Sequence, residues 1–148
     1  MIKISNALTG VRKIYFDTAP LVYYVEENPT YVKRMDAIIE QIEKMSMRAF
    51  SSVILIPEVL MLPTRLGKKE LVKAYKTILF NSRQFQLTDV SLQIAVRATD
   101  LRAQYNLRTP DAIHVATALE LGCELFLTND KGLTRVSEIQ VLILDVVE

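Results

Sequence analysis

The stretch RTPDAIHVATALELG, Arg108 to Gly122, decides much of the fold, because it predicts an apolar helix that begins with charged residues. Residues 112–119 are almost wholly apolar, which predicts a helix that is buried on most of its surface. Thr109 can cap this helix, Pro110 suits its first position, and Asp111 complements the positive end of the helix dipole. These local roles are sufficient to explain an aspartate at this place.

The composition is that of a globular protein, and the 148 residues suit a single domain, 1–148. Half of the residues are hydrophobic and 24% are charged, which excludes a disordered chain. Lys and Arg (18) nearly balance Asp and Glu (17), so a nucleic-acid partner would need a local basic patch. The one cysteine, Cys123, forms no internal disulfide, and there is no Cys/His cluster for zinc.

No segment of the sequence is typical of a membrane protein. The first residues, MIKISNALTGVRK, lack the apolar core of a signal peptide. The longest apolar run, VILIPEVLML, is interrupted by Pro57 and Glu58 and is too short to span a bilayer. We therefore expect a soluble, cytoplasmic protein.

Apolar strands alternate with amphipathic helices on both sides of the opening stretch. We expect strands at 11–16, 48–52, 85–88, 124–128 and 141–147. We expect helices at 18–28, at 31–47, through Glu58 toward Arg65, and at 68–80, 91–105 and 109–121. Pro63 should bend or end the helix that carries Glu58.

Helical spacing of apolar residues predicts which faces of these helices lie inward. The set is Met35, Ile38, Ile39 and Ile42 in the helix 31–47, Leu71, Tyr75, Ile78 and Leu79 in the helix 68–80, and Leu92, Ala95, Val96 and Leu101 in the helix 91–105. The alternation of strands and helices implies right-handed crossovers. The predicted fold class is therefore α/β, a three-layer α/β/α arrangement with a mainly parallel twisted sheet of about five strands.

Four acids stand where such a sheet collects functional groups, at the carboxyl ends of its strands. Each has a structural explanation, as a helix cap, a charge near a helix N-terminus or a turn residue. Together they would repel one another and would need protons or a cation. The four are Asp17, Glu58, Asp111 and Asp130.

A hard divalent cation would resolve this repulsion, since Mg²⁺ and Mn²⁺ prefer oxygen ligands. A metal ion held by acids can activate water and offset the charge of a phosphodiester. The sequence offers no credible nucleophile dyad as a competing mechanism. Metal-assisted hydrolysis is therefore the chemistry that the acids indicate.

Four segments carry a resemblance to a known family. YFDTAPLVYYVEENP, SSVILIPEVL, LRTPDAIHVATALELG and LFLTND, in this order, resemble the PIN domain, the fold of VapC-type toxin ribonucleases from type II toxin–antitoxin systems. The resemblance implies a Mg²⁺-dependent ribonuclease, with Mn²⁺ as a substitute. It also implies an RNA substrate, a cognate antitoxin and a homodimer.

The motif match gives each acid an expected role. Asp17 and Asp111 would be the most direct metal ligands, and Glu58 and Asp130 would complete the catalytic pocket by binding a second metal or by orienting water. Thr18 and Thr128 match polar positions near such pockets, but they are equally explained as ordinary hydroxyls at strand ends.

The sequence departs from the family pattern at three places. Ala19 stands where a serine or asparagine is often found, which removes a hydrogen-bonding group from the rim. Pro57 and Pro63 put the direction of the helix that carries Glu58 in doubt. The residues before Arg12 extend beyond the usual start of the first strand. None of these departures removes an acid.

Other polar residues have competing interpretations. His114, the only histidine, is better explained as a core or supporting hydrogen-bonding residue than as a general base. Asp100 fits the solvent face of its helix and is left outside the site. The basic stripe Lys69, Lys73 and Lys76 could follow an RNA backbone, but a solvated helix face explains it better.

The sequence does not decide which aromatic and apolar residues form a surface for a partner. Tyr23, Tyr24 and Tyr31 could stack on bases, line a dimer contact or border a groove for an antitoxin peptide. The apolar segment 53–62 is either core or interface.

Three other functions compete with the nuclease. A PIN-like module that binds RNA or protein without cleavage would not need to keep all four acids. An aspartyl-phosphate phosphatase would need a second acid where Ala19 stands, and a receiver domain would need an acidic pair that 1–10 lacks.

Overall fold

The computed structural model describes all residues, Met1–Glu148, and has a five-stranded sheet at its centre. The strands are β1 (Lys13–Phe16), β2 (Arg48–Ser52), β3 (Phe85–Thr88), β4 (Leu125–Thr128) and β5 (Gln140–Ile143). They lie in the order β3-β2-β1-β4-β5, and every neighbouring pair is parallel. The chain leaves β1 toward β2 on one side and later returns to β4 on the other.

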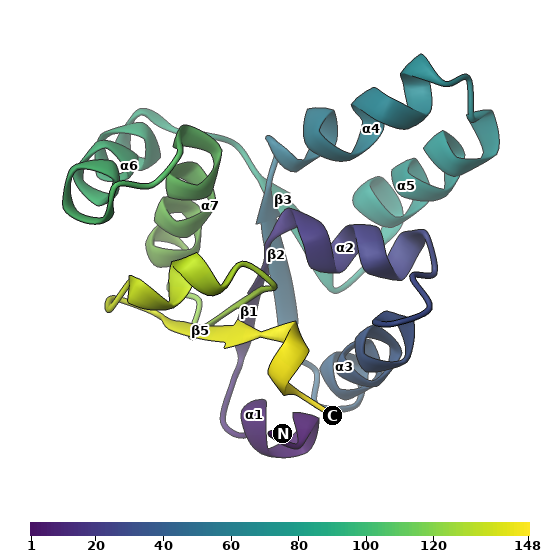
Figure 1. Cartoon of the computed structure of the whole chain (residues 1–148), viewed down its shortest axis with the longest axis horizontal. Coiled ribbons are helices and arrows are strands. Elements are labelled where there is room, and N and C mark those ends of the chain that lie inside the picture. The colour runs from purple at the N-terminus through teal and green to yellow at the C-terminus, as the bar shows by residue number, and fades with distance from the viewer.

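Seven α-helices cover the sheet (Figure 1). They are α1 (Ile4–Ala7), α2 (Thr18–Val25), α3 (Val32–Lys44), α4 (Leu55–Arg65), α5 (Lys69–Asn81), α6 (Leu92–Tyr105) and α7 (Thr109–Glu120). Two short 3₁₀ helices, Lys131–Arg135 and Leu144–Val146, follow β4 and β5. The three-layer α/β/α fold predicted from the sequence is confirmed.

Each face of the sheet has its own hydrophobic core. On one face, apolar residues of α1 to α5 pack against strand residues such as Ile14, Phe16 and Leu127. On the other face, α6 and α7 pack against Tyr15, Phe50 and Phe126. Neighbouring strand residues thus alternate between the two cores, as the pleat of a strand requires.

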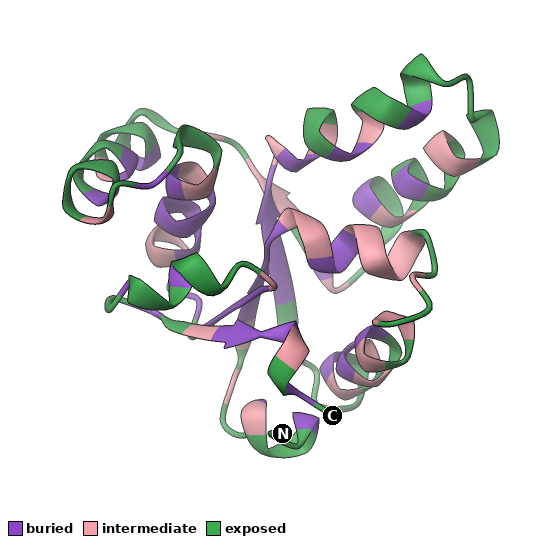
Figure 2. Cartoon of the chain, in the orientation of Figure 1, coloured by how far each residue is buried: buried purple, intermediate pink, exposed green.

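Helix α7 is buried along most of its length (Figure 2). Small residues allow α7 to pack closely against its neighbours. Ala112, Ala116 and Ala118 have no exposed surface. Cys123, just beyond this helix, is buried, and burial raises the pKa of its thiol to about 12. A buried thiol whose pKa is raised in this way is a poor nucleophile at neutral pH.

The predicted inner face of α6 is largely wrong. Leu92 and Val96 are 89% and 66% exposed, and Ala95 is exposed as well. The residues that face the core are Ile94, Ala98 and Leu101, of which only Leu101 was predicted. In α5 the predicted face is correct, because Tyr75 and Leu79 are buried and the other two residues pack against the same core.

The two ends of the sequence also differ from expectation. The last strand is shorter than the predicted range 141–147, since it ends at Ile143 and continues as a 3₁₀ turn. The segment before the first strand forms α1, and Ile2 pairs in parallel with Val147. Elsewhere Pro63 lies inside α4, which ends two residues later. No helix is long and apolar enough to cross a bilayer.

Candidate active site

Asp17 lies at the carboxyl end of the central strand, where the strand order reverses between β1 and β4. Its backbone N–H continues the ladder to Leu127 (2.9 Å), and the next residue begins α2. One carboxylate oxygen accepts from the backbone N–H of Thr18 at 2.8 Å, so Asp17 caps this helix. The other oxygen accepts from the Thr128 hydroxyl at 2.7 Å. Crevices at such reversal points are where parallel sheets bind ligands.

The Asp17 carboxylate is buried, with 8% of the residue exposed. Burial raises its pKa above the ordinary value, and the nearby Asp111 charge raises it further. His114 and the hydrogen bonds from Thr128 and Thr18 oppose this shift without cancelling it. A buried carboxylate that carries an energetic penalty for its charge is one that a bound cation would stabilise.

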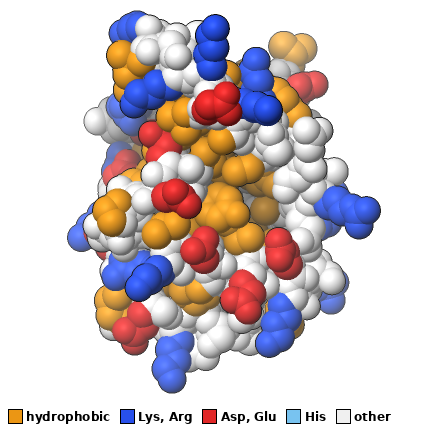
Figure 3. Space-filling model, turned by 90° about the vertical axis from the view of Figure 1, so that its right-hand side faces the viewer, with side chains coloured by type: hydrophobic (Ala, Val, Ile, Leu, Met, Phe, Trp, Pro, Cys, Tyr) orange, Lys and Arg blue, Asp and Glu red, His pale blue; other side chains and the backbone are white.

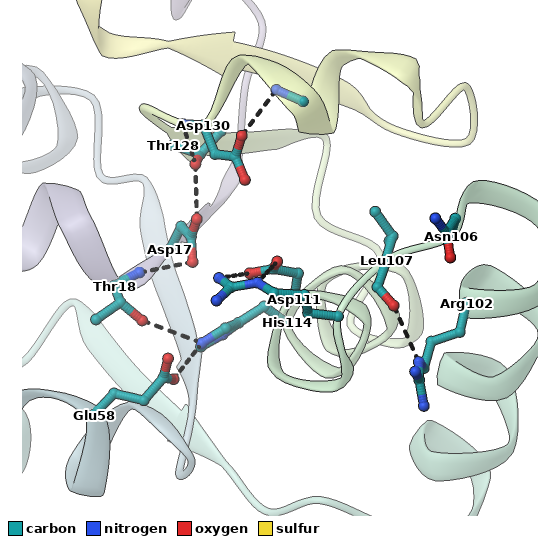
Figure 4. Close-up of polar contacts among 12 residues, drawn as sticks. Asp17, Thr18, Glu58, Arg102, Asn106, Leu107, Asp111, His114, Thr128 and Asp130 are labelled. Atoms are coloured by element: carbon teal, nitrogen blue, oxygen red, sulfur yellow. Dashed lines mark hydrogen bonds and ion pairs between the residues drawn. The ribbon is translucent and has the colours of Figure 1, made fainter.

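Asp111 is placed by the tight corner between α6 and α7 (Figure 4). The corner turns at Asn106, which adopts a left-handed conformation (φ 53°) that asparagine tolerates. The Arg102 side chain donates from Nε to the carbonyl of Leu107 at 3.0 Å and so holds the corner closed. The predicted cap is wrong, because Thr109 is the first helical residue and Arg108 occupies the cap position without a side-chain bond.

Arg108 forms an ion pair with Asp111. Its Nε lies 3.1 Å from Oδ2, and its Nη2 lies 3.5 Å from Oδ1. The Arg108 side chain is 80% exposed and that of Asp111 is 15% exposed. The pKa of Arg108 is raised, first by the hydrogen bond to Asp111 and also by the charges of Asp130 and Glu58. Three of the four acids therefore stabilise the charged form of Arg108.

Asp130 follows β4 and begins the 3₁₀ helix Lys131–Arg135. Its Oδ1 accepts from the N–H of Gly132 at 2.8 Å, which is the turn-shaping role considered from the sequence. Its own N–H donates to the Thr128 hydroxyl at 3.0 Å. Thr128 therefore joins Asp17 and Asp130 through a single hydroxyl group.

Glu58 reaches the site from the first turn of α4. Its Oε1 lies 2.8 Å from Nε2 of His114, a side chain that is 1% exposed. The same nitrogen lies 3.3 Å from the Thr18 hydroxyl, and Nδ1 of the ring lies 2.7 Å from the Tyr15 hydroxyl. The expectation that His114 is a supporting hydrogen-bonding residue agrees with these contacts.

The four acids surround one opening at the carboxyl edge of the sheet (Figure 4). Asp130 lies at one side, Asp17 and Asp111 lie in the middle, and Glu58 lies at the opposite side. No three His, Cys, Asp or Glu side chains are close enough together to hold a metal ion. The acids are thus gathered at one rim without forming a closed cluster of ligands.

The donor set fits Mg²⁺ or Mn²⁺ better than a metal that needs a full protein cage. Mg²⁺ usually keeps several waters and takes one or two carboxylates from the protein. Each oxygen of Asp17 has accepted one hydrogen bond and retains a further lone pair. Asp111, whose charge acts on Asp17, would supply the second carboxylate after a shift of Arg108.

Several residues considered from the sequence lie outside this opening. Asp100 is exposed on α6, and Lys69, Lys73 and Lys76 are exposed on α5. Thr18 and Thr128, in contrast, both bond to site residues. Two contributors were missed, Tyr15 and Arg108. Arg108 had a signal, since a basic residue three positions before an acid is a helical neighbour of it, whereas Tyr15 reads as an ordinary strand residue.

Comparison with known structures shows the same fold in toxin–antitoxin complexes. VapBC2 of Rickettsia felis, bound to a DNA fragment from its promoter, has a TM-score of 0.72 and 14% identity over 88% of this chain and 98% of that one. The DNA-bound VapBC of Salmonella typhimurium has a TM-score of 0.69 and 16% identity over 89% and 98%. VapC20 of Mycobacterium tuberculosis, a toxin that cleaves the Sarcin-Ricin loop, has a TM-score of 0.61 and 17% identity over 86% and 98%.

Sequence comparison gives the family directly. No protein with a curated description matches the sequence at a significant level. The PIN domain family matches residues 14–139, which include β1 from Ile14 onward, β2, β3, β4 and all four acids, and which end just before β5. The chain therefore belongs to the PIN domain family.

Proposed function

We propose that this protein is a metal-dependent endoribonuclease that hydrolyses RNA phosphodiester bonds, and that it is the toxin of a toxin–antitoxin pair. The observation that carries the proposal is the buried Asp17 carboxylate, which is fixed by Thr128 and Thr18 and interacts with Asp111. Membership of the PIN family supports a nuclease, and the VapBC neighbours support the toxin assignment. Such an enzyme would act on RNA in the cytoplasm.

Asp17 and Asp111 would hold Mg²⁺, or Mn²⁺ in its place. When bound, the metal would supply Lewis-acid activation of water and compensation of charge on the phosphodiester. Asp17 would keep a fixed orientation, because both of its oxygens are already bonded within the fold. Glu58 and Asp130, on opposite sides of the opening, would orient water or the substrate.

Arg108 would have two states in this scheme. In the structure it is paired with Asp111, and its side chain is largely exposed. Where Asp111 holds a metal, Arg108 would no longer be paired with it, and its guanidinium would be free to bind an RNA phosphate. The nearly neutral net charge of the chain makes such a local cation important for RNA binding.

An antitoxin partner is supported by an apolar surface on the α2–α5 side of the molecule (Figure 3). Val22, Val59, Leu62 and Leu71 line a groove of about 180 Å³ between α2, α4 and α5, with Glu58 and Glu26 at its border. Met61 and Leu62 of α4, and Leu66 just after this helix, are each about half exposed. The apolar segment 53–62 is therefore part core and part open surface. A homodimer, as in the resembling family, completes the proposal.

The test is cleavage of a mixed pool of structured RNA by the purified, partner-free protein. The reactions contain Mg²⁺, Mn²⁺ or EDTA, and an Asp111→Asn variant is assayed beside the wild type. We expect cleavage with either metal, none in EDTA, and loss of cleavage in the variant. Equal cleavage by the variant would contradict the assignment of Asp111.

A second outcome separates the enzyme from a module that only binds. Binding of the same RNA pool is measured by filter retention under the same metal conditions. Retention of RNA by the wild type without cleavage, with every metal, would replace the nuclease by a non-cleaving PIN-like module.

A further inference from the structure

His114 joins elements that belong to opposite faces of the sheet. It lies on α7, which packs in the core of α6 and Tyr15, whereas Glu58 lies on α4 and Thr18 on α2, whose apolar residues pack in the other core. The hydrogen bonds of its Nε2 to Glu58 and to Thr18 therefore pass across the carboxyl end of the sheet. No apolar side chain could make this connection.

The position of Glu58 depends on this connection more than on helix packing. Helix α4 makes its main contacts with α5 and α2, and it projects from the body of the molecule (Figure 1). The buried residues of α4 are Leu55, Val59 and Pro63, and the first two pack in the core on the face of the sheet opposite α7. Since Glu58 lies between them on the exposed part of the first turn, His114 is the residue that directs its carboxylate to the rim.

The hydrogen bonds also determine where the imidazole carries its proton. A carboxylate only accepts hydrogen bonds, so Nε2 of His114 must be the donor to Glu58. In a neutral ring the other nitrogen, Nδ1, is then an acceptor, and the Tyr15 hydroxyl must donate to it. Tyr15 is fully buried, so its hydroxyl makes this bond out of contact with water. A chain of hydrogen bonds thus runs from Tyr15 through His114 to Glu58, and each residue donates to the next.

We propose that His114 is a positioning residue: Tyr15 holds it in the Nε2–H tautomer, and it fixes the Glu58 carboxylate at the rim beside Asp17 and Asp111. His114 does not touch the reacting atoms in this scheme. It acts in the way that buried partners of active-site carboxylates act, by fixing the direction of the group that does the chemistry. The kinetic part of the inference rests on the proposed ribonuclease function, whereas its structural part does not.

The first test reads the proton directly. His114 is the only histidine, so ¹⁵N labelling of histidine gives signals from this ring alone. At neutral pH we expect a protonated Nε2 and an unprotonated Nδ1, with an Nε2–H that exchanges slowly with water. In Glu58→Ala this proton should exchange faster, and in Tyr15→Phe the fixed tautomer should be lost. A ring protonated on Nδ1 alone, or on both nitrogens, would overturn the proposal.

The second test is a double-mutant cycle on cleavage rate. His114→Leu should lower kcat by roughly 10- to 100-fold, the usual cost of removing a partner that orients an active-site group, and should change KM less. In a Glu58→Ala background the same change should lower the rate by no more than about twofold, since the residue through which His114 acts is gone. An equal loss in both backgrounds would overturn the proposal.

Two further variants separate positioning from stability. Val115→Ala removes buried volume from the same helix without a polar contact to the site, and it should lower Tm while leaving kcat unchanged. His114→Gln keeps an amide donor near the place of Nε2 and should recover part of the rate lost in His114→Leu. A Gln variant as slow as the Leu variant would contradict the donor role.

The two proposals can fail separately. If the wild type cleaves no RNA, the ribonuclease function is wrong, and the ring spectrum still decides where the His114 proton lies. If the wild type cleaves RNA and His114→Leu cleaves it equally well, the ribonuclease function stands and the positioning role is wrong.

Discussion

The inner and the outer half of the candidate site are built by different means. Asp17 is 8% exposed and is fixed by hydrogen bonds from two other elements of the fold. Asp111 is paired with Arg108, the residue at the N-cap of the same helix, whose side chain is 80% exposed. The inner acid therefore has one position, and the outer pair can rearrange. Under the proposed function, Asp17 would be the fixed metal ligand, and Asp111 would become a ligand only after Arg108 moves away.

The charges in the two halves of the site should also have different effects on the stability of the protein. Burial penalises the ionised form of Asp17, so this residue costs stability in the absence of a cation. An exposed pair such as Arg108–Asp111 adds little to stability, because water screens it. Substitutions can test this contrast, and we order them by the size of the expected effect.

The largest effect is expected for Asp17→Asn. The amide keeps the helix cap but cannot neutralise a metal, so cleavage should fall by at least about a hundredfold. The measurement is the initial rate of RNA cleavage with Mg²⁺. Asp100→Asn, the same exchange at an exposed position of α6, is the matched control and should keep the wild-type rate. Equal rates for the two variants would contradict the inner-acid assignment.

A smaller effect is expected for Thr128→Val, which preserves shape and removes the hydroxyl shared by Asp17 and Asp130. The buried carboxylate then loses one of its two bonds, which should cost about 1–3 kcal/mol of unfolding free energy. Cleavage should fall roughly tenfold, because Asp17 is less well oriented. Urea denaturation and the cleavage rate measure the two effects. A stability loss with an unchanged rate would show that orientation of Asp17 is not limiting.

The effect of Asp17 on thermal stability should depend on both metal and pH. The pKa of Asp17 is raised in the folded protein, so its protonated form favours folding. This contribution to the free energy of unfolding is complete below the unfolded pKa of about 3.8 and is lost as pH rises through the folded pKa. In EDTA the Tm of Asp17→Asn should therefore exceed that of wild type at neutral pH, and the difference should shrink as pH falls. Mg²⁺ should raise the Tm of wild type only. A wild type that is the more stable protein in EDTA at neutral pH would contradict the burial penalty.

The smallest effect is expected for Arg108→Ala. Loss of an exposed ion pair should leave the unfolding free energy almost unchanged, because water screens the two charges. Removal of a competing cation from Asp111 should tighten Mn²⁺ binding a few-fold, on the order of the screened interaction of one charge. Titration calorimetry with Mn²⁺ measures this change. Weaker binding in the variant would mean that Arg108 orders Asp111 for the metal and does not compete with it.

The fold could be predicted because its signals are repeated along the chain. Five apolar strands separated by helices leave few topologies for a parallel sheet, and the layer arrangement follows from them. Strand β1 and helices α5 and α7 appeared within a few residues of their expected bounds. The parts that failed, α1 and the end of the last strand, depend on the pairing of Ile2 with Val147, which is remote in sequence.

The inner face of α6 could not be predicted, because the helix carries two apolar stripes. Leu92 and Val96 form one stripe, and Ile94, Ala98 and Leu101 form the other. Both have helical spacing, so the periodicity of the sequence favours neither. The core of α7 selects the second stripe, and that contact is tertiary. The first stripe remains open on the surface.

The candidate site could be predicted in its residue types and not in its connections. Strand-end acids converge by a general rule of parallel sheets, which is why all four could be named together. The hydroxyl of Thr128 between two acids, and the chain from Tyr15 through His114 to Glu58, depend on side-chain directions set by packing. Only local spacing is visible in a sequence, and the local contacts of the site are Arg108–Asp111, Asp17–Thr18 and Thr128–Asp130.

The projection of α4 from the body of the molecule has a consequence for local unfolding. Backbone amides open with free energies that depend on how deeply an element is packed, from near zero up to the full stability of the protein. Helix α7 is buried along its length, so its amides should exchange with deuterium only when the whole molecule unfolds. Helix α4 packs mainly on α2 and α5 and exposes much of its surface, so its amides should exchange through smaller openings. Glu58 thus lies on an element that can leave the site for short times while Asp111 and His114 remain in place.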